Sequence, residues 1–451
     1  MTGTESVSTP PWGKAMDDSP MNPFLWRVTA FCAGGFLLDG YILGIIGSAL
    51  ALMGPSLGLS AVTMGLIAAS SLIGIFVGGI AVGRLVDRMG RQKIFLIDLT
   101  VFLVASLLQL LISEPWQLIA LRFIMGVAIG ADFVIGMTLL AEFAPRRWRG
   151  VLLGSLNVIG VVGFALAFVF GEILGGLEGD DAWRWMLASS AVPTVIVLLL
   201  RLGAPESPRW LASKGRADEA QAVLDRFIGP GYVVGEVPNP NLRSSYRALF
   251  TPNMWRRTIF AGGFWACQVL PFFAVYMFLP QILNSLGVED GFTTQLYFNV
   301  FLVVGAAVGL PVMQWLPRRV FLSSTFALSA MALTVLAFLP PNAALAILIA
   351  FVVFAVCLSA ATNLLHCYPG ELFPTELRAT GVGFAAAISR IGASLGAFLL
   401  PITVDEYGTV PSVLGLAAVL ILGLIMTLAW APETRNLSLA DASDPEATVR
   451  K

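Results

Sequence analysis

The sequence predicts an all-α membrane protein with twelve transmembrane helices, arranged as two pseudo-symmetric bundles of six. Three observations support this fold class. Of the 451 residues, 57% are hydrophobic and only 12% are charged, against about a quarter charged in a soluble protein. Twelve apolar segments are long enough to cross a bilayer, and two motifs occur twice in the same order. The mean hydropathy of +0.83 agrees with a chain built for lipid.

Each predicted span meets the requirement of about 20 mostly apolar residues. Glycine and proline recur inside the spans, as helix packing in lipid permits. Residues 1–25 are predicted to be a disordered tail and 432–451 a second tail. The spans lie near 26–50, 62–84, 94–112, 115–142, 150–175, 184–203, 256–284, 293–316, 319–339, 343–371, 378–402 and 411–431.

A polar insert, residues 204–255, separates the two predicted bundles, 26–203 and 256–431. Its stretch "ESPRWLASKGRADEAQAVLDRFI" has apolar residues at helical spacing. The insert is therefore expected to be a linker with one or two short amphipathic helices.

The distribution of Lys and Arg predicts the orientation in the membrane. The two tails and the loops after spans 2, 4, 6, 8 and 10 hold 24 of the 27 basic residues, whereas the opposite loops hold Arg184 among acidic residues. The positive-inside rule places both termini and the insert in the cytoplasm. We expect a multi-pass protein of the plasma (inner) membrane, monomeric and surrounded by the lipid bilayer. The net charge of −1 gives no reason to expect a nucleic-acid partner.

Enzyme and metal chemistry are not expected. The four cysteines lie in apolar stretches without a C-x-x-C pair, and the chain has one histidine. These residues predict neither a metal site nor a disulfide framework, and nearly exclude the usual catalytic triads. We expect no cofactor, and a proton gradient as the source of energy.

The two repeated motifs predict an internal duplication. The pattern E-x-x-P-x-x-x-R occurs from Glu142 to Arg149 after span 4, and from Glu371 to Arg378 after span 10. "APESPRW" follows span 6 and "APETRNL" follows span 12. Two halves in the same orientation, related by an axis along the membrane normal, are typical of one class of secondary transporters.

Charged residues at the cytoplasmic helix junctions predict a gate. Such charges bond to helix ends and to each other only when the cytoplasmic side is shut; a solvated, positive-inside loop is the alternative. Around Arg318 and Arg319 no matching acid is found, so the second half is expected to have a weaker or differently built gate. The candidate gating residues are Asp87, Arg88, Arg91, Glu142, Arg149, Glu206, Glu371, Arg378, Glu433 and Arg435.

Ionisable residues inside the spans are the main functional candidates. Asp39 is the single charged residue between Arg27 and Arg84, although such a group costs at least ~2.5 kcal/mol near the bilayer centre. With a rise of about 1.5 Å per residue, Asp39 lies roughly 20 Å from the cytoplasmic side, Arg390 roughly 18 Å, and Arg122 roughly 10 Å from the other face. These three charges are predicted to meet near the midplane.

The chemistry of these groups suggests proton coupling. A carboxylate in a dry cavity is costly when ionised and cheap when protonated, so Asp39 can carry a proton. If Arg122 approaches it in one conformation only, proton affinity changes with conformation. Asp132, in "GVAIGADFVIG", is a second proton or gating candidate, with structural helix pairing as the alternative. Arg390 is a candidate anchor for a carboxylate or phosphate; permanent pairing with Glu371 is its alternative.

The motifs resemble those of the major facilitator superfamily. "GRLVDRMGRQK", from Gly83 to Lys93, is similar to its loop signature. Both E-x-x-P-x-x-x-R segments, "PESPRWLASKGR" and "PETRNLSL" resemble its sugar-porter-like branch, which includes bacterial metabolite and aromatic-acid proton symporters and organic ion transporters. The resemblance runs from about residue 24 to 440.

The resemblance also implies roles for individual residues. Proton-coupled sugar porters carry an Asp just after Gly-Tyr in span 1, facing an Arg in span 4. Here Gly40 and Tyr41 are followed by Ile42, and the acid is Asp39, three residues earlier and on the same helix face. Aromatic-acid symporters carry D-G-Y-D, whose first Asp is kept. The resemblance therefore implies a proton-coupling role for Arg122 directly, and for Asp39 as the substitute for the acid that is missing after Tyr41.

Two further positions resemble functional residues of this branch. Asp132 is similar to the acid in the G-G-D-Y segment of phosphate symporters, without the proline that follows there. Arg390 matches the position of an Arg in the organic anion transporters.

Span 7 departs from the sugar porters, which carry Gln-Gln and then Gly-Ile-Asn there. "FWACQVLPFFAVYMFLPQIL" keeps Gln268 and Tyr276, but has Pro271 and Phe273 at the Gly and Asn positions. An aromatic wall leaves the hydroxyls of a polyol without partners and suits an amphipathic organic anion, including an aromatic one. The predicted substrate-binding residues are Arg390, Gln268, Tyr276, Tyr41, Phe273, Trp265, Asn157 and Asn363.

The sequence thus favours a secondary transporter that couples the symport of a small organic anion, a carboxylate above all, to protons by alternating access. Three alternatives stay open: a drug or organic cation exporter that uses Asp39 and Asp132, a proton:sugar symporter, and a membrane sensor with the insert as its output.

Overall fold

The computed structural model is built almost entirely of α-helices. Twelve spans within its described residues are long and apolar enough to cross a membrane, which agrees with the predicted fold class. The structure describes residues 14–145, 147–176, 181–234, 246–252, 254–286, 291–340 and 343–435, and their side chains apart from those of 82–84, 86–88, 246, 291, 366, 375, 376 and 379.

The first group of helices holds spans 1 to 6. Span 6 is divided by a short turn at Ser189 and Ser190, a break that the sequence analysis did not predict. The elements of this group are β1 (Lys14–Ala15), η1 (Met16–Asp18), α1 (Pro23–Leu57), α2 (Ala61–Met89), α3 (Arg91–Leu108), η2 (Gln109–Leu111), α4 (Pro115–Phe143), α5 (Arg149–Gly175), α6 (Ala182–Ala188) and α7 (Ala191–Arg201). We call α1 to α7 the N half.

The insert and the second group follow. Span 7 is divided at Phe278, where two helices meet. The elements are α8 (Pro208–Ser213), α9 (Ala217–Phe227), β2 (Tyr232–Val233), η3 (Tyr246–Phe250), α10 (Trp255–Met277), α11 (Leu279–Ser285), α12 (Gly291–Trp315), α13 (Arg318–Phe338), α14 (Ala344–Leu372), α15 (Thr375–Tyr407) and α16 (Thr409–Trp430). We call α10 to α16 the C half.

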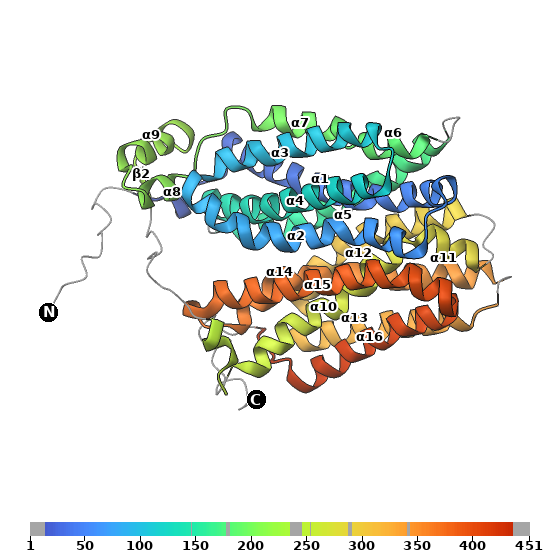
Figure 1. The fold of residues 1–451 in the computed structure, drawn as a ribbon. Helices are drawn as coiled ribbons and strands as arrows, with labels where there is room; N and C mark the ends of the chain where they lie inside the picture. The colour runs from blue at the N-terminus through green and yellow to red at the C-terminus, as the bar shows by residue number, and fades with distance from the viewer. Residues whose placement is uncertain are drawn as a thin grey trace.

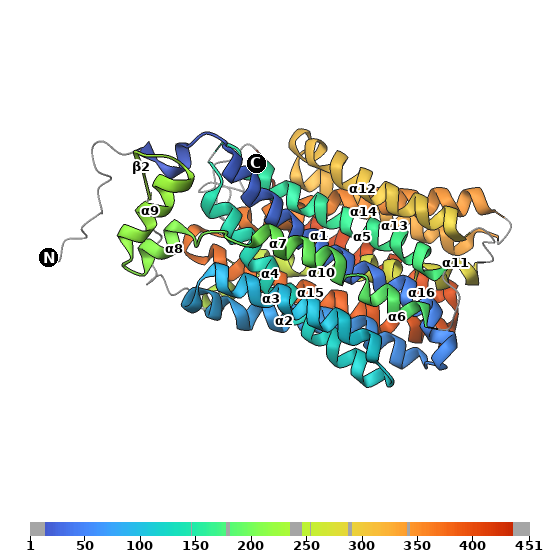
Figure 2. The same ribbon diagram turned by 90° about the horizontal axis from the view of Figure 1, so that it is seen from above.

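The two halves lie side by side with their helices roughly along one direction (Figure 1). Both views place α8 and α9 beyond one end of the N half, at the left in Figures 1 and 2. We call this end of the molecule the insert end. Helices α1 and α3 begin at this end and α2 and α4 reach it with their last turns, so residues near the middle of a helix lie halfway between the two ends.

Small residues set the spacing between helices, as is typical of membrane bundles. A Cβ atom added at Gly40 of α1 would lie 2.0 Å from the carbonyl oxygen of Gly160 in α5. Across the two halves, a Cβ at Gly65 of α2 would lie 2.5 Å from the carbonyl oxygen of Phe398 in α15. Such close backbone contact holds Asp39, the neighbour of Gly40, at a defined place beside α5.

The predicted disordered tail of residues 1–25 needs correction for its described part. Lys14 and Ala15 pair in parallel with Tyr232 and Val233, next to the insert helices. Asp17 accepts hydrogen bonds from Arg209 at 2.7 and 2.8 Å and forms an ion pair with Arg149. Polar tail residues therefore find partners on the insert, which a reading of composition alone does not reveal. We call residues 14–22 the strap.

Candidate functional site

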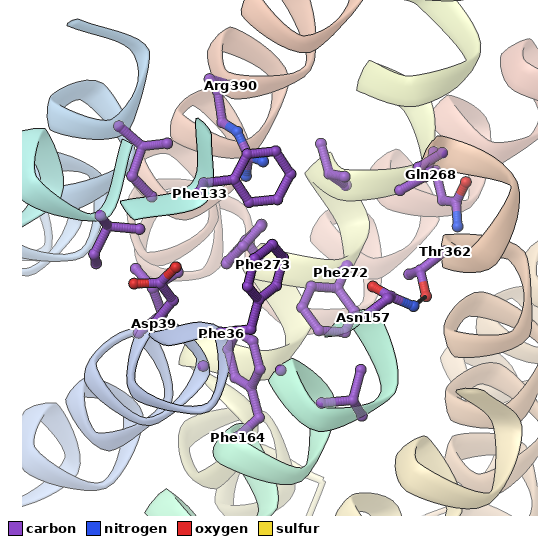
Figure 3. Close-up of a pocket in the computed structure, with 18 of the residues that line it drawn as sticks. Phe36, Asp39, Phe133, Asn157, Phe164, Gln268, Phe272, Phe273, Thr362 and Arg390 are labelled. Carbon is purple, nitrogen blue, oxygen red and sulfur yellow. Dashed lines mark hydrogen bonds between the residues drawn. The ribbon is translucent and has the colours of Figure 1, made fainter. Parts of the chain in front are cut away.

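A cavity lies between the two halves, near the middle of the helices. Its described lining comes from α1, α2, α4 and α5 of the N half and α10, α14 and α15 of the C half. Aromatic rings make up much of its wall, and Figure 3 shows them between two groups of polar side chains. The lining residues include Phe36, Asp39, Phe133, Asn157, Phe164, Trp265, Gln268, Phe272, Phe273, Thr362 and Arg390.

Asp39 brings a carboxylate to the N-half wall of this cavity. Its side chain is buried, with 7% of the residue exposed. Neither carboxylate oxygen accepts a hydrogen bond from any residue that the structure describes. An ionised carboxylate in such a place lacks the donors that usually stabilise it, so the protonated form is favoured.

Arg390 brings a positive charge to the C-half wall. Its guanidinium lies over the ring of Phe133, 5.7 Å from the ring centroid, and within electrostatic range of Asp39. It forms no ion pair with a carboxylate among the described residues. Permanent pairing with Glu371 is excluded here, because Glu371 is held by Arg318 at 3.4 Å and by the Thr434 hydroxyl at 2.5 Å.

Three polar residues lie on the other side of the aromatic rings. Asn157 of α5 donates to the Thr362 hydroxyl at 2.9 Å, across the boundary between the halves. Gln268 donates to the Leu358 carbonyl at 3.1 Å, and its own side-chain oxygen is buried without a donor among the described residues. Figure 3 shows these amides apart from Asp39 and Arg390. The cavity thus has a charged side and an amide side.

Some predicted substrate-binding residues line this cavity and others do not. Trp265 and Phe273 line it, as do Gln268, Asn157 and Arg390. The Tyr276 hydroxyl instead donates to the Phe164 carbonyl at 2.7 Å, and the Tyr41 hydroxyl bonds with Ser189 at 2.6 Å. Asn363 accepts from Asn157 at 3.1 Å and donates to the Ala306 carbonyl at 2.9 Å. Helix packing turns Tyr276, Tyr41 and Asn363 toward backbone and side-chain partners in this conformation, and a substrate-binding role for them stays a prediction.

Arg122 does not pair with Asp39 in this structure. The residue is 1% exposed, and its guanidinium donates to the Ile42 carbonyl at 3.5 Å. Because α1 crosses α4 nearby, the arginine meets the backbone of α1 one turn away from the acid. The predicted approach of Arg122 to Asp39 is therefore absent from this conformation.

Asp132 belongs to a buried ion-pair cluster that the sequence analysis missed. Arg201, at the end of α7, lies 2.9 Å from Asp132 and 3.8 Å from Asp98 of α3. The side chains of all three are at most 1% exposed. The signal was present in the sequence as an acid inside the apolar run "IFLIDLTVFL". Its arginine was overlooked because it stands at the edge of span 6.

At the insert end, the N half carries two linked charge contacts. Arg91 at the start of α3 pairs with Glu142 of the first E-x-x-P-x-x-x-R motif at 3.0 Å. Glu206 of "APESPRW" accepts from the backbone N–H groups of Arg91 at 3.0 Å and Gln92 at 3.2 Å. A carboxylate at these N–H groups caps the helix and complements its dipole.

The C half repeats this arrangement. Arg318 at the start of α13 pairs with Glu371 at 3.4 Å. Glu433 accepts from the backbone N–H groups of Arg318 at 2.9 Å and Arg319 at 3.1 Å. The expectation that Arg318 and Arg319 lack a matching acid was wrong, because the acid comes from the distant second copy of the motif. Only folding brings it to the helix start.

The remaining gating candidates have different surroundings. Arg149 donates to the Ala144 carbonyl at 3.1 Å as well as pairing with Asp17. The backbone N–H of Arg435 donates to Glu433 at 2.9 Å. Two guanidinium nitrogens of Arg378 are buried without an acceptor in the described part of the chain. The side chains of Asp87 and Arg88 lie outside the described residues.

The chain is similar to known transporters along nearly all of its length. The sequence profile of a family described as "Sugar (and other) transporter" matches residues 28–444. The inner membrane metabolite transport protein YgcS of Escherichia coli (strain K12) is 42% identical, over 95% of this chain and 96% of that protein.

More distant relatives carry different named substrates. The arabinose-proton symporter of Bacillus subtilis (strain 168) is 30% identical over 91% of this chain and 93% of its own length. The gallate transporter of Pseudomonas putida is 27% identical over 85% and 86%. A partially occluded, inward-open structure of the xylose transporter XylE from E. coli has the same fold, with a TM-score of 0.78, 18% identity, and coverage of 92% of this chain and 100% of that one.

Proposed function

This chain belongs to the sugar (and other) transporter family of the major facilitator superfamily, and on that premise we propose that it carries a small organic anion together with a proton. We place its insert end, with both termini, on the cytoplasmic side of the inner membrane. One observation carries the proposal: a carboxylate and a guanidinium, Asp39 and Arg390, face the same buried cavity from opposite halves, and neither has an ion-pair partner among the described residues.

The charges of these two groups give a reason for coupling. In the empty cavity, Asp39 is the counter-charge of Arg390. An anionic substrate takes over this role when it binds the guanidinium, and the carboxylate is then left without a partner in a dry site. Protonation of Asp39 removes that cost. The cavity is neutral both when empty and when it holds anion and proton, so each anion is expected to bring one proton.

The wall of the cavity favours an amphipathic substrate. Phe36, Phe133, Phe164, Phe272 and Phe273 offer ring faces and edges. The amides on the far side are partly engaged, Asn157 with the Thr362 hydroxyl and Gln268 with the Leu358 carbonyl. An aromatic carboxylate would place its charge on Arg390 and its ring among the phenylalanines, and a relative named as a gallate transporter supports this class.

A sugar is the second candidate. The buried side-chain oxygen of Gln268 needs a donor, which a sugar hydroxyl would supply, and one relative is named as an arabinose-proton symporter. A polyol would nevertheless leave most of its hydroxyls against aromatic carbon, where unmade hydrogen bonds cost about 1–3 kcal/mol each. We therefore rank the anion first. Arg390 in the wall argues against a cationic drug.

The insert-end ion pairs have a structural part in this proposal. Each described pair, Arg91 with Glu142 and Arg318 with Glu371, lies within one half. We infer that they keep the helix ends of each half together, so that the halves move as units when access changes from one side to the other.

Uptake into proteoliposomes tests the proposal. The purified chain would be reconstituted and offered gallate, succinate, arabinose or ethidium, with and without an imposed pH gradient. We expect gallate uptake to exceed that of the other three, and to fall to the undriven level when a protonophore is added. Uptake of arabinose alone would transfer the proposal to the sugar. Gallate uptake that ignores the pH gradient would contradict coupling.

Two substitutions assign the roles. Arg390→Ala removes a charge-assisted contact and is expected to weaken gallate uptake about 10- to 100-fold, since such bonds contribute about 1.5–3 kcal/mol. Asp39→Asn should keep gallate exchange across the membrane but lose accumulation driven by the pH gradient. Arg216→Gln is the matched control, because that exposed guanidinium pairs with Glu219 far from the cavity.

A further inference from the structure

The ion-pair cluster behind the cavity wall is built from four helices. Asp98 comes from α3, Asp132 from α4 and Arg201 from α7, while the backbone of α1 closes the fourth side. None of the three side chains lines the cavity. The cluster is thus a separate, dry group of charges within the N half.

Both terminal nitrogens of Arg201 have partners in this cluster. Its guanidinium bonds with Asp132 at 2.9 Å and reaches the carbonyl oxygens of Phe31 at 3.3 Å and Phe95 at 3.4 Å. Its central carbon lies 3.4 Å from the centroid of the Phe95 ring. One positive charge therefore serves two carboxylates, and its donors are shared with backbone.

The two carboxylates have too few donors between them. Asp98 accepts one hydrogen bond, from the backbone N–H of Leu99 at 2.6 Å. The Oδ2 atoms of Asp98 and Asp132 are buried and accept no bond from any described residue. Yet the two carboxyl groups lie close together, because both contact the one guanidinium of Arg201, at 3.8 Å from Asp98 and 2.9 Å from Asp132. Two acceptors can bond only if one of them carries a proton, and like charges this close do not both ionise.

The backbone of α1 leaves room for this pair only because residue 35 is glycine. A Cβ atom there would lie 2.1 Å from Oδ2 of Asp132 and 2.5 Å from Nη2 of Arg201. The space belongs to the carboxyl and the guanidinium, and any other residue at position 35 would displace them. The close fit shows a built site rather than a chance meeting of charges.

Other titratable groups face the cluster from α1. Cys32 lies within electrostatic range of Arg201 and Asp132. Asp39, one turn after Gly35, lies within range of Asp132, Arg201 and, across the cavity, Arg390. Asp39 and Arg390 balance each other across the cavity, so the cluster itself has two carboxyl groups against the single guanidinium of Arg201, and one bound proton makes it neutral.

We propose that Asp98 and Asp132 hold one proton between them and form, with Arg201, a proton-binding site behind the cavity wall, distinct from the proton assigned to Asp39. The proton lies on an oxygen of one carboxyl group. This O–H donates a hydrogen bond to the other carboxylate, which keeps its ion pair with Arg201. A metal cation is disfavoured because Arg201 already occupies the cationic position, 2.9 Å from Asp132. This site goes beyond the proposed function and does not depend on the identity of the substrate.

Infrared spectroscopy of the purified full-length chain tests the site without any substrate. A protonated carboxyl has a carbonyl stretching band separate from that of carboxylate, and it shifts in heavy water. The measurements use Asp39→Asn as background, so that residue 39 cannot contribute. At neutral pH we expect one carboxyl equivalent of this band. Asp98→Asn or Asp132→Asn, added singly, should each remove it, because the remaining aspartate then pairs with Arg201 without a proton.

Controls separate the proposal from its alternatives. Asp225→Asn, which removes an exposed carboxyl of α9 bonded to Gln221, should leave the band unchanged. Thermal unfolding establishes that each variant is folded, and either Asn variant alone suffices. Absence of the band in the background protein at neutral pH, or its survival in a folded Asp98→Asn or Asp132→Asn variant, overturns the proposal. So does stabilisation by sodium over choline that Asp98→Asn abolishes, since it would assign a metal cation instead.

Discussion

The N half and the C half share the same construction at the insert end but differ inside the membrane. Arg318 follows Arg91 by 227 positions, and Glu433 follows Glu206 by the same 227. In both halves the Glu caps the helix that the Arg begins, and the Arg pairs with the acid of its own E-x-x-P-x-x-x-R motif.

The buried cluster has no such counterpart. With the same displacement of 227 positions, Asp98 corresponds to Thr325 and Arg201 to Leu428. Asp132 corresponds to Ala361 when α14 is aligned with α4 through Glu142 and Glu371. The C half thus has neutral residues where the N half has an acid pair and its arginine.

The comparison separates scaffold from chemistry. Contacts that hold helix ends together are repeated, because both halves meet the same mechanical need. Charges inside the membrane are costly and occur where each half has its own task. In our proposal the N half binds protons through Asp39 and the Asp98–Asp132 pair, and the C half binds the anion through Arg390.

The strongest test of the difference between the halves is the pair Arg201→Ala and Leu428→Ala. Loss of Arg201 leaves two buried acids without a counter-charge, and breaking such a pair costs about 3–5 kcal/mol. Leu428 is 51% exposed, so its truncation should cost less than about 1 kcal/mol. Thermal unfolding in detergent measures both. Equal effects would show that the buried cluster contributes nothing special to the N half.

Arg390→Lys sharpens the assignment of the anion to the C half. Lysine keeps the charge but loses the planar fork that binds a carboxylate with two hydrogen bonds. We expect the KM for gallate to rise about 10-fold, equivalent to ~1.4 kcal/mol, with pH-driven accumulation kept. An unchanged KM would remove Arg390 from the anion site.

The repeated caps predict equal effects in the two halves. Glu206→Gln and Glu433→Gln each replace a carboxylate that accepts hydrogen bonds from two backbone N–H groups by a neutral amide. Each change should cost about 0.5–1 kcal/mol of stability. The two sites are distant and share no described partner, so the double variant should show the sum in a melting experiment. A large effect at one site alone would break the symmetry.

A smaller effect on stability is expected in the strap. Asp17→Asn removes a partly exposed acid that joins Arg149 and Arg209, and such pairs contribute less than about 1 kcal/mol. The melting temperature of the protein should fall by no more than the Glu206→Gln variant shows. A larger fall would make the strap a main support of the N half.

The smallest effect is expected for an exposed ion pair of the insert, Arg216 with Glu219, and is measured as the pH dependence of melting. The hydrogen bond from Arg216 lowers the pKa of the Glu219 carboxyl. A carboxyl whose pKa is lower in the folded chain stabilises the fold at pH values above its pKa in the unfolded chain. This stabilisation is lost as the pH falls through the pKa in the folded chain. Because 47% of the Arg216 side chain and 58% of the Glu219 side chain are exposed to solvent, Arg216→Gln should leave the pH dependence of melting unchanged within error. A clear acid-side shift would contradict this.

The sequence by itself determined the membrane spans, the duplication and the family. Hydrophobic runs of the length of a bilayer have one stable form, since backbone groups in lipid must bond within their own helix. For the same reason Asp39 and Arg390 stood out as candidates: a charge inside an apolar run is visible without any structure. Cavity-lining Trp265, Phe273, Gln268 and Asn157 were also within reach of this reasoning.

Only the tertiary structure decided which charges meet. Arg201 finds Asp98 and Asp132, Glu433 finds the start of α13, and Tyr276 turns to the Phe164 carbonyl. Sequence periodicity gives the face of one helix, but not the rotation and depth of its neighbours. Those depend on close packing at residues such as Gly35 and Gly40, where a single added carbon would change the distance between helices.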